Sequence, residues 1–174
     1  QLVVRQAEDH LELARHFRPV VLWEFFDELA RDLSRSRRHP HLPGFSLNPS
    51  IQVTSDLASA AAAAELLVFA LPSNRLRETS RRVRLLRGEK PFIVVNASKG
   101  VEKESLSTMG DILEQEFSGL KSRVFTLSGP SFAREVAQGV ITKVVLAGTP
   151  PAAAARLRGL FQGGPLRLEL STDR

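Results

Sequence analysis

Small polar residues and one lysine follow three apolar runs of the sequence, and they are side chains suited to binding an anion. They are Pro72-Ser73-Asn74, Ser98-Lys99-Gly100 and Ser128-Gly129-Pro130-Ser131, after the runs LLVFAL, FIVVNA and VFTL. A lysine between serine and glycine brings a compact charge with a flexible reach to a phosphate or a carbonyl group. Taken alone, Lys99 is better explained as a loop lysine in water, because most lysines are exposed.

The stretch LSGPSFARE at 127–135 crowds small residues into the turn before an expected helix. Such a turn can simply cap the helix. It can also hold an anion, because backbone N–H groups at a helix N-terminus are unpaired and carry a partial positive charge. In that interpretation Gly129 lets the ligand approach the backbone, and Ser131 adds a hydroxyl donor. Together with Lys99, the pattern favours a phosphate site.

The elements that must position these residues alternate along the chain, strand then helix. Several strand candidates are apolar throughout, which indicates burial on both faces of a parallel sheet. The strands are expected at 19–23, 51–54, 66–71, 92–95, 124–127, 143–148 and 166–170. The helices are expected near 8–17, 26–34, 56–64, 75–87, 104–117, 131–138 and 151–162. The predicted fold is a single α/β domain over 1–174, with a doubly wound, Rossmann-like, mostly parallel sheet.

Residues 1–12 leave two alternatives for the start of this sheet. They form either a first strand and the start of a helix, or an isolated helix that leaves the sheet one strand short. Helix starts elsewhere carry capping signals: Ser55 or Asp56 before one helix, and Ser73 or Asn74 before the next. Pro130 suits an early position in the helix that follows it.

Composition narrows the classes of function. The 174 residues carry a net charge of +5 and no cysteine, so disulfides and thiolate metal sites are excluded. Arginines cluster at 34–41 and 75–87, but the apolar residues interleaved in the second cluster are typical of the exposed face of an amphipathic helix. We therefore expect no nucleic-acid partner. No apolar run is long enough to span a membrane and no export signal is visible, so we expect a cytoplasmic protein without a membrane partner or a metal.

Seven motifs, in this order along the chain, resemble the bacterial-type NAD(P)-dependent glycerol-3-phosphate dehydrogenases. The resemblance covers roughly residues 13–173, and the pairing of SKG with SGPSFA is its most specific part. The motifs are VVLW (20–23), HLPG (41–44), TSDL (54–57), ALPS (70–73), NASKGVE (96–102), LSGPSFAREVAQG (127–139) and LRLELSTD (166–173).

The resemblance implies reversible hydride transfer between NAD(P)H and dihydroxyacetone phosphate, which yields sn-glycerol 3-phosphate for phospholipid synthesis. It places Lys99 between the cofactor and the substrate. It assigns Gly129 and Ser131 to the small phosphorylated three-carbon substrate, and Ala133 to the cofactor. His41, which stands where the family has an aromatic residue before Leu-Pro, is also assigned to the cofactor. The resemblance is also compatible with a homodimer.

The sequence also departs from the family. The family begins with a glycine-rich turn for the dinucleotide pyrophosphate, whereas residues 1–17 contain no glycine and place Glu8 and Asp9 there. We therefore expect the affinity of this chain for a dinucleotide to be reduced. After VVLW, Phe25 and Phe26 stand where the family has a basic residue, so the choice between NAD and NADP stays open. The tyrosine expected near the last strand is Glu169.

The family's catalytic residues are not expected within this chain. In the family a helical domain follows this part and supplies the general acid/base lysine, so the chain is expected to end before the catalytic domain. His10, His16, His39 and His41 are interpreted as surface or structural residues. Three interpretations follow: the N-terminal domain of such a dehydrogenase, a non-catalytic relative that keeps a phosphate pocket, or a dehydrogenase for another small acid. The SGPSFA motif argues against the third interpretation, a dehydrogenase for another small acid.

Overall fold

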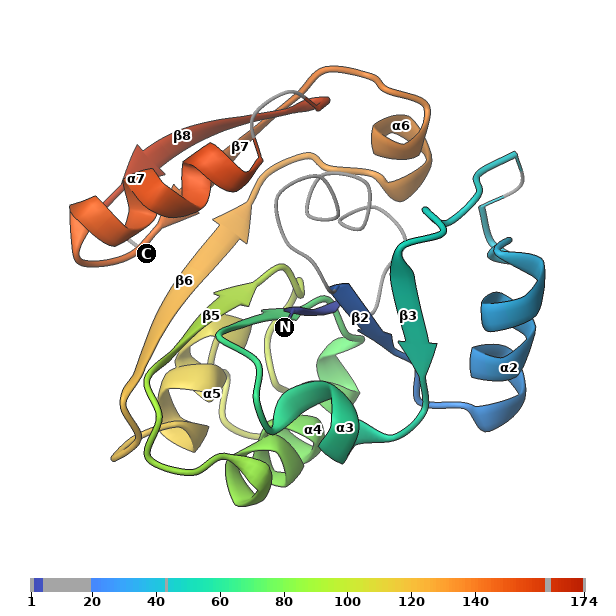
Figure 1. Ribbon diagram of the computed structural model, residues 1–174. Helices are drawn as coiled ribbons and strands as arrows, with labels where there is room; N and C mark the ends of the chain where they lie inside the picture. Colours follow the sequence, from blue (N-terminus) through green and yellow to red (C-terminus); the bar gives the residue numbers. More distant parts are fainter. Residues whose placement is uncertain (1, 5–19, 43, 162–163, 174) are drawn as a thin grey trace.

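An eight-stranded sheet, parallel except at one pair, forms the centre of the computed structural model (Figure 1), with strand order β3-β2-β1-β4-β5-β6-β7-β8. The structure describes residues 2–4, 20–42, 44–161 and 164–173. The strands are β1 (Leu2–Val4), β2 (Val20–Trp23), β3 (Ile51–Thr54), β4 (Leu66–Phe69), β5 (Phe92–Asn96), β6 (Ser122–Ser128), β7 (Thr142–Ala147) and β8 (Leu166–Ser171). The helices are α2 (Asp27–Ser36), α3 (Leu57–Ala61), α4 (Ser73–Leu86), α5 (Met109–Glu116), α6 (Ala133–Ala137) and α7 (Pro151–Leu160). The predicted fold class is confirmed.

The first strand is present, which decides between the two alternatives for the N-terminus. β1 lies between β2 and β4, where Leu2 pairs with both Val20 and Leu66. Strands β3, β2, β1, β4, β5 and β6 therefore have the order of a doubly wound dinucleotide-binding sheet. The helix expected at 8–17, the missing glycine turn, Glu8, Asp9, His10 and His16 lie outside the described residues.

The pairing of β6 with β7 differs from the parallel pairing that strand–helix alternation predicts. These two strands are antiparallel, with Leu127 opposite Leu146. The connection between them contains only the five-residue helix α6, which is short for the crossover that parallel strands need. After this reversal α7 provides a regular crossover, and β8 runs parallel to β7.

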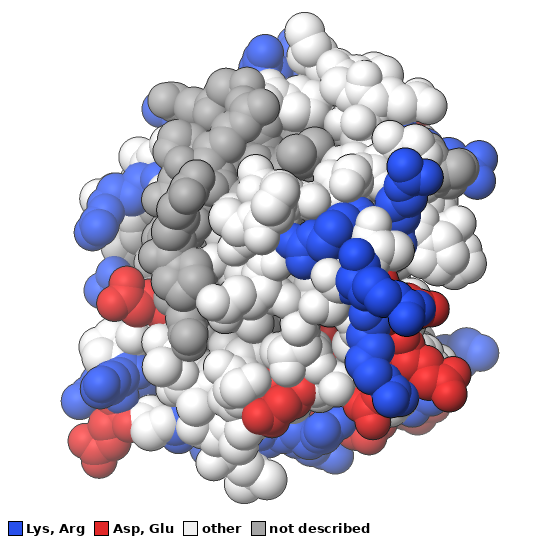
Figure 2. Space-filling model, turned by 45° about the vertical axis from the view of Figure 1, so that its right-hand side comes forward, with Lys and Arg blue, Asp and Glu red and all other residues white. Residues whose placement is uncertain are grey.

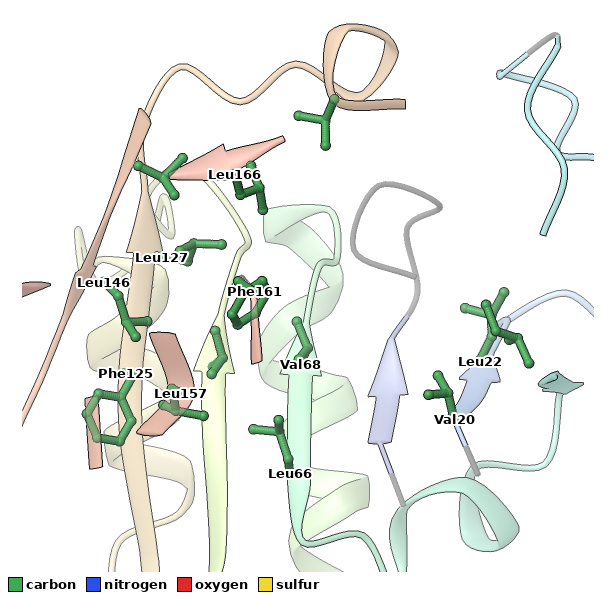
Figure 3. Close-up of a cluster of buried hydrophobic side chains, with 14 of the residues drawn as sticks. Val20, Leu22, Leu66, Val68, Phe125, Leu127, Leu146, Leu157, Phe161 and Leu166 are labelled. Carbon is green, nitrogen blue, oxygen red and sulfur yellow. The ribbon is translucent and has the colours of Figure 1, made fainter. Parts of the chain in front are cut away.

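Apolar side chains fill both faces of the sheet, as the uninterrupted apolar runs predict. On one face, side chains of β2, β4, β6 and β7, such as Val20, Val68 and Leu146, form one buried cluster with Leu157 and Phe161 of α7 and its end (Figure 3). Helices α3, α4 and α5 cover the other face. Burying one such side chain contributes about 1.5–3 kcal/mol, so the two layers hold the strand ends in fixed positions.

The starts of the helices confirm one capping prediction and correct two. Asp56 caps α3, because its side chain accepts a hydrogen bond from the Ala58 N–H at 2.9 Å. The prediction for α4 is wrong: Pro72 is the N-cap residue and no side chain caps the helix. Pro130 does not lie in the first turn either, because α6 begins only at Ala133.

The arginines of α4 are not simply a solvated face. Several of them bind partners on neighbouring elements instead of facing only water. Arg84 Nη1 donates to the carbonyl oxygens of Glu116 and Ser118, at the end of α5. Arg87 Nη1 donates to three carbonyl oxygens at the end of α3, and burial lowers the pKa of Arg87. These arginines serve the packing of α4.

Basic and acidic side chains lie next to each other on the side of the molecule shown in Figure 2. Within the arginine cluster at 34–41, Arg35 pairs with Asp32 at 2.8 Å, and both side chains are exposed. Arg37 instead donates to the carbonyl oxygens of Asn48 and Ile51. In the part of the chain that is described, no helix has the length and apolar character needed to cross a membrane.

Candidate functional site

The loops after β4, β5 and β6 meet at one edge of the sheet and enclose a pocket of about 280 Å³. Parallel strands end at the same edge, which is where ligands of doubly wound sheets bind. The pocket is lined by Ala70, Leu71, Pro72, Ala97, Ser98, Lys99, Leu127, Ser131, Phe132, Ala133, Val136 and Leu166. The loops that the sequence singled out are therefore neighbours in space.

Lys99 and Ser131 are in direct contact although they are 32 positions apart. The Lys99 ammonium donates to the Ser131 carbonyl oxygen at 2.9 Å and to its hydroxyl at 3.3 Å. The Phe132 ring centroid lies 5.8 Å from Nζ, within the range of a cation–π contact. An ammonium has three donors, so within the described part of the chain one is left for a ligand.

Ser98 ties the loop that carries Lys99 to the neighbouring strand end. Its side chain is buried, and its hydroxyl donates to the Phe69 carbonyl at 3.1 Å and accepts from the Leu71 N–H at 2.8 Å. The Ser98 N–H in turn donates to the Asn96 side chain at 3.0 Å. One hydroxyl thus joins the ends of β4 and β5 and fixes the backbone immediately before Lys99.

Glu102 holds the same loop on the other side of Lys99. Arg77 of α4 binds it through two hydrogen bonds of 2.6 and 2.7 Å, a bidentate arrangement. Arg77 also donates to Glu116 of α5 at 2.6 Å. The hydrogen bonds from Arg77, and then from Ser105, lower the pKa of Glu102 to about 2. The same carboxylates raise the pKa of Arg77.

Gly129 is placed differently from the expectation that it opens the backbone to a ligand. A Cβ atom there would lie 2.9 Å from the Lys143 carbonyl oxygen and 2.9 Å from Val144 Cγ1. Real Cβ atoms do not approach other atoms so closely, so glycine is needed for the contact between this turn and β7. Gly129 does not line the pocket that contains Lys99.

The other two residues assigned to the cofactor, besides Lys99, lie apart. Ala133, half-buried at the start of α6, lines the pocket with Lys99. His41 is exposed in the loop after α2 and does not line that pocket. Its backbone N–H donates to the ring Nδ1 of His39 at 3.2 Å. Burial lowers the pKa of His39, and the nearby His41 adds to this effect. The structure thus gathers Lys99, Ser131 and Ala133, and leaves His41 outside.

A second pocket, of about 610 Å³, lies against the same lysine. Ser98, Lys99 and Leu127 line both pockets, so the two spaces adjoin at Lys99. The other lining residues are Asn96, Gly100, Thr108, Met109, Gly110, Asp111, Glu114, Thr126, Ser128, Val145, Ala147 and Asp173. Among the residues that the structure describes, no group of three or more His, Asp or Glu side chains could hold a metal ion.

Sequence reasoning missed the residues that position Lys99. Ser98 stood among the small polar residues after a strand, but nothing in the sequence showed that its hydroxyl bridges to β4. Arg77 and Glu102 are 25 positions apart, and in the sequence they stand only in an arginine run and in the NASKGVE motif. The Thr108–Asp111 capping box at the start of α5 carries a readable signal, a threonine three positions before an acidic residue.

A family model and the curated relatives of this chain point to one family. A family model described as "NAD-dependent glycerol-3-phosphate dehydrogenase N-terminus" matches residues 11–154. The chain is 39% identical over 162 residues to glycerol-3-phosphate dehydrogenase (NAD(P)+) of Desulfovibrio desulfuricans, covering 92% of this chain and 48% of that protein. It is 36% identical to one such enzyme of Salinibacter ruber, covering 94% of this chain and 48% of that protein. The chain thus spans about half the length of these relatives.

Solved structures show the same fold. The crystal structure of glycerol-3-phosphate dehydrogenase from Coxiella burnetii superimposes with a TM-score of 0.86 at 22% identity, over 99% of this chain and 53% of that one. The enzyme from Saccharomyces cerevisiae gives a TM-score of 0.81 at 18% identity, over 98% of this chain and 56% of that one.

Proposed function

The chain belongs to the family of NAD-dependent glycerol-3-phosphate dehydrogenases, and from this premise we propose that it binds the cofactor and the substrate of such an enzyme. The substrate class is a small phosphorylated three-carbon compound. In the reduction of dihydroxyacetone phosphate, a hydride passes to the carbonyl carbon and a proton to its oxygen, giving sn-glycerol 3-phosphate. The nicotinamide of a bound NAD(P)H supplies that hydride.

The observation that carries the proposal is the contact between Lys99 and Ser131 at the meeting point of three strand ends. The ammonium and the Ser131 hydroxyl can both donate to a phosphate or carbonyl oxygen, and a charge-assisted bond of this kind is strong. The two adjoining pockets at Lys99 together give room for a nicotinamide ring and a short substrate. Small side chains such as Ala97 and Ala133 suit the flat ring.

Binding and positioning are the tasks proposed for the residues of this chain. Lys99 lies between the substrate and the cofactor, Ser131 donates to the substrate, and Ala133 borders the ring of the cofactor. Gly129 contributes by allowing the Ser131 turn to pack on β7. The proton donor is proposed to lie in the half of the enzyme that this chain does not span, so no catalytic residue is assigned here.

A non-catalytic relative that keeps only the phosphate pocket is the second candidate function. One observation favours it: residues 1–17 contain no glycine and include Glu8 and Asp9, which suits a dinucleotide pyrophosphate poorly.

One pair of titrations separates the two functions. Trp23, the single tryptophan, lies buried at the end of β2, so its fluorescence reports NADH bound at this edge of the sheet through energy transfer. The dehydrogenase half should bind both NADH and glycerol 3-phosphate. Binding of glycerol 3-phosphate without NADH supports the second candidate. Binding of neither contradicts both.

We also propose the use of the product, the location of the enzyme and its oligomeric state. The product would serve phospholipid synthesis, the enzyme would be cytoplasmic, and it would form a homodimer. Sedimentation of the full-length enzyme tests this proposal. A homodimer should sediment with twice the mass of one chain.

A further inference from the structure

The loop that follows Lys99 has no apolar anchor of its own. All residues of 100–108 lie within the described part of the chain, and none of them is buried. Its two large apolar side chains are in contact with solvent, because Val101 is 54% exposed and Leu106 is 76% exposed. Since apolar burial does not hold this segment, its shape depends on polar contacts.

Glu102 is the residue on which the shape of this loop depends. Leu106 has a φ of 55°, in the left-handed region that residues with a side chain rarely adopt. The Glu102 carbonyl accepts from the Leu106 N–H at 2.8 Å, and the Glu102 N–H donates to the Ser107 carbonyl at 3.0 Å. The Glu102 carboxylate also accepts from the Ser105 hydroxyl at 2.6 Å. A strained backbone persists only where the surrounding contacts fix it, and here those contacts converge on one residue.

Arg77 fixes Glu102 in turn. The two side chains are only 22% and 17% exposed, so their bidentate pair is less screened by water than a pair on the surface. A further N–H of Arg77 reaches Glu116, which is 11% exposed, at 2.6 Å. With a carboxylate on each side, the guanidinium cannot turn without losing a charge-assisted hydrogen bond. Arg77 thereby ties the loop to α4 and α5, which lie side by side (Figure 1).

We propose that Arg77 is a positioning residue for the substrate: by holding Glu102, it keeps the loop, and with it Lys99, where the ammonium can meet the phosphorylated compound. The proposal rests on the proposed function and deepens it, because it names a residue outside both pockets on which the affinity depends. Neither Arg77 nor Glu102 lines a pocket that Lys99 lines. A loss of affinity on replacing Arg77 would therefore not come from a lost contact with the ligand.

The test titrates glycerol 3-phosphate into the chain and its variants by calorimetry. Arg77→Gln should raise the dissociation constant at least about fivefold, as the loss of a charged hydrogen bond predicts. Arg77→Lys keeps the charge but not the two parallel bonds, so it should recover part of the affinity. The matched control is Arg81→Gln, one turn further along α4. Arg81 is 64% exposed and pairs with Glu116 at 3.2 Å, so this variant should keep the affinity.

Two further measurements show whether Arg77 acts through the loop. Glu102→Gln breaks the same contact from the other side, so it should weaken binding by a similar factor. The double variant Arg77→Gln/Glu102→Gln should then agree with either single variant to within about twofold. Amide hydrogen exchange of Arg77→Gln should be faster at the Leu106 N–H, while the N–H of Val94, buried in β5, keeps its rate.

Each outcome decides the proposal. Unchanged affinity in a folded Arg77→Gln variant, or losses that add up in the double variant, overturns it. Faster exchange at Val94 as well as Leu106 also overturns it, because the change would then be a general loss of stability. Circular dichroism shows whether each variant is folded, and Glu102→Gln decides if Arg77→Gln is not. If the wild type itself does not bind glycerol 3-phosphate, the proposed function fails together with this role. If the wild type binds and Arg77→Gln binds equally well, only the role of Arg77 fails.

Discussion

Replacing Ser98 by alanine tests whether one buried hydroxyl holds the strand ends together. The change leaves the Leu71 N–H without the partner it has at 2.8 Å. The Phe69 carbonyl loses Ser98 as a donor but keeps the Ala97 N–H at 2.8 Å, so its loss adds little. An unsatisfied buried donor costs about 1–3 kcal/mol, and we expect the free energy of unfolding to fall by that amount.

Urea denaturation followed by circular dichroism measures this loss, and the slope of the transition should stay unchanged. Ser118→Ala is the matched control, because Ser118 is exposed, and it should alter the free energy of unfolding by less than about 0.5 kcal/mol. Ser98→Ala should also weaken glycerol 3-phosphate binding, since the backbone before Lys99 is released. If Ser98→Ala is as stable as Ser118→Ala, the hydroxyl does not bridge the two strands and the reasoning is refuted.

Two further predictions concern the surroundings of the site. Gly129→Ala should lower the free energy of unfolding by about 1–3 kcal/mol, as overpacking does, because its Cβ would meet β7; Gly88→Ala, with no atom within 4 Å, is the control in the same urea assay. Glu102 has a pKa of about 2 in the folded protein against an ordinary 4.5, so it stabilises the fold above pH 4.5 and loses this effect as the pH falls towards 2. The difference in Tm between wild type and Glu102→Gln should therefore shrink over that range, and a constant difference would exclude the pair with Arg77 as its cause.

Much of the fold could be predicted because its signals are local. Runs such as 66–71 are apolar throughout, which is what a strand covered on both faces requires, and β4 is buried at every residue. The reversal at β7 could not be predicted, because it depends on how little helix forms between β6 and β7. The five residues of α6 look like the start of a longer helix when only the sequence is seen.

The candidate site could be predicted in outline for the same reason. Lys99 and Ser131 follow strands whose ends must meet, so their proximity follows from the topology. The groups that hold them depend on contacts between distant segments, as between Arg77 and Glu102, and no local pattern marks such contacts. Gly129 shows a different limit of the sequence. The sequence shows a glycine in this turn, but it does not show whether a ligand or a neighbouring strand requires it.

Titration of glycerol 3-phosphate into wild type and Lys99→Ala tests the central claim, that the pocket between the strand ends binds the phosphorylated substrate through Lys99. Loss of a charged hydrogen bond costs about 1–3 kcal/mol, so the dissociation constant should rise roughly 5- to 150-fold. Lys103→Ala removes the same charge from an exposed position in the same loop and should leave the affinity unchanged. Equal affinities of wild type and Lys99→Ala would contradict the account.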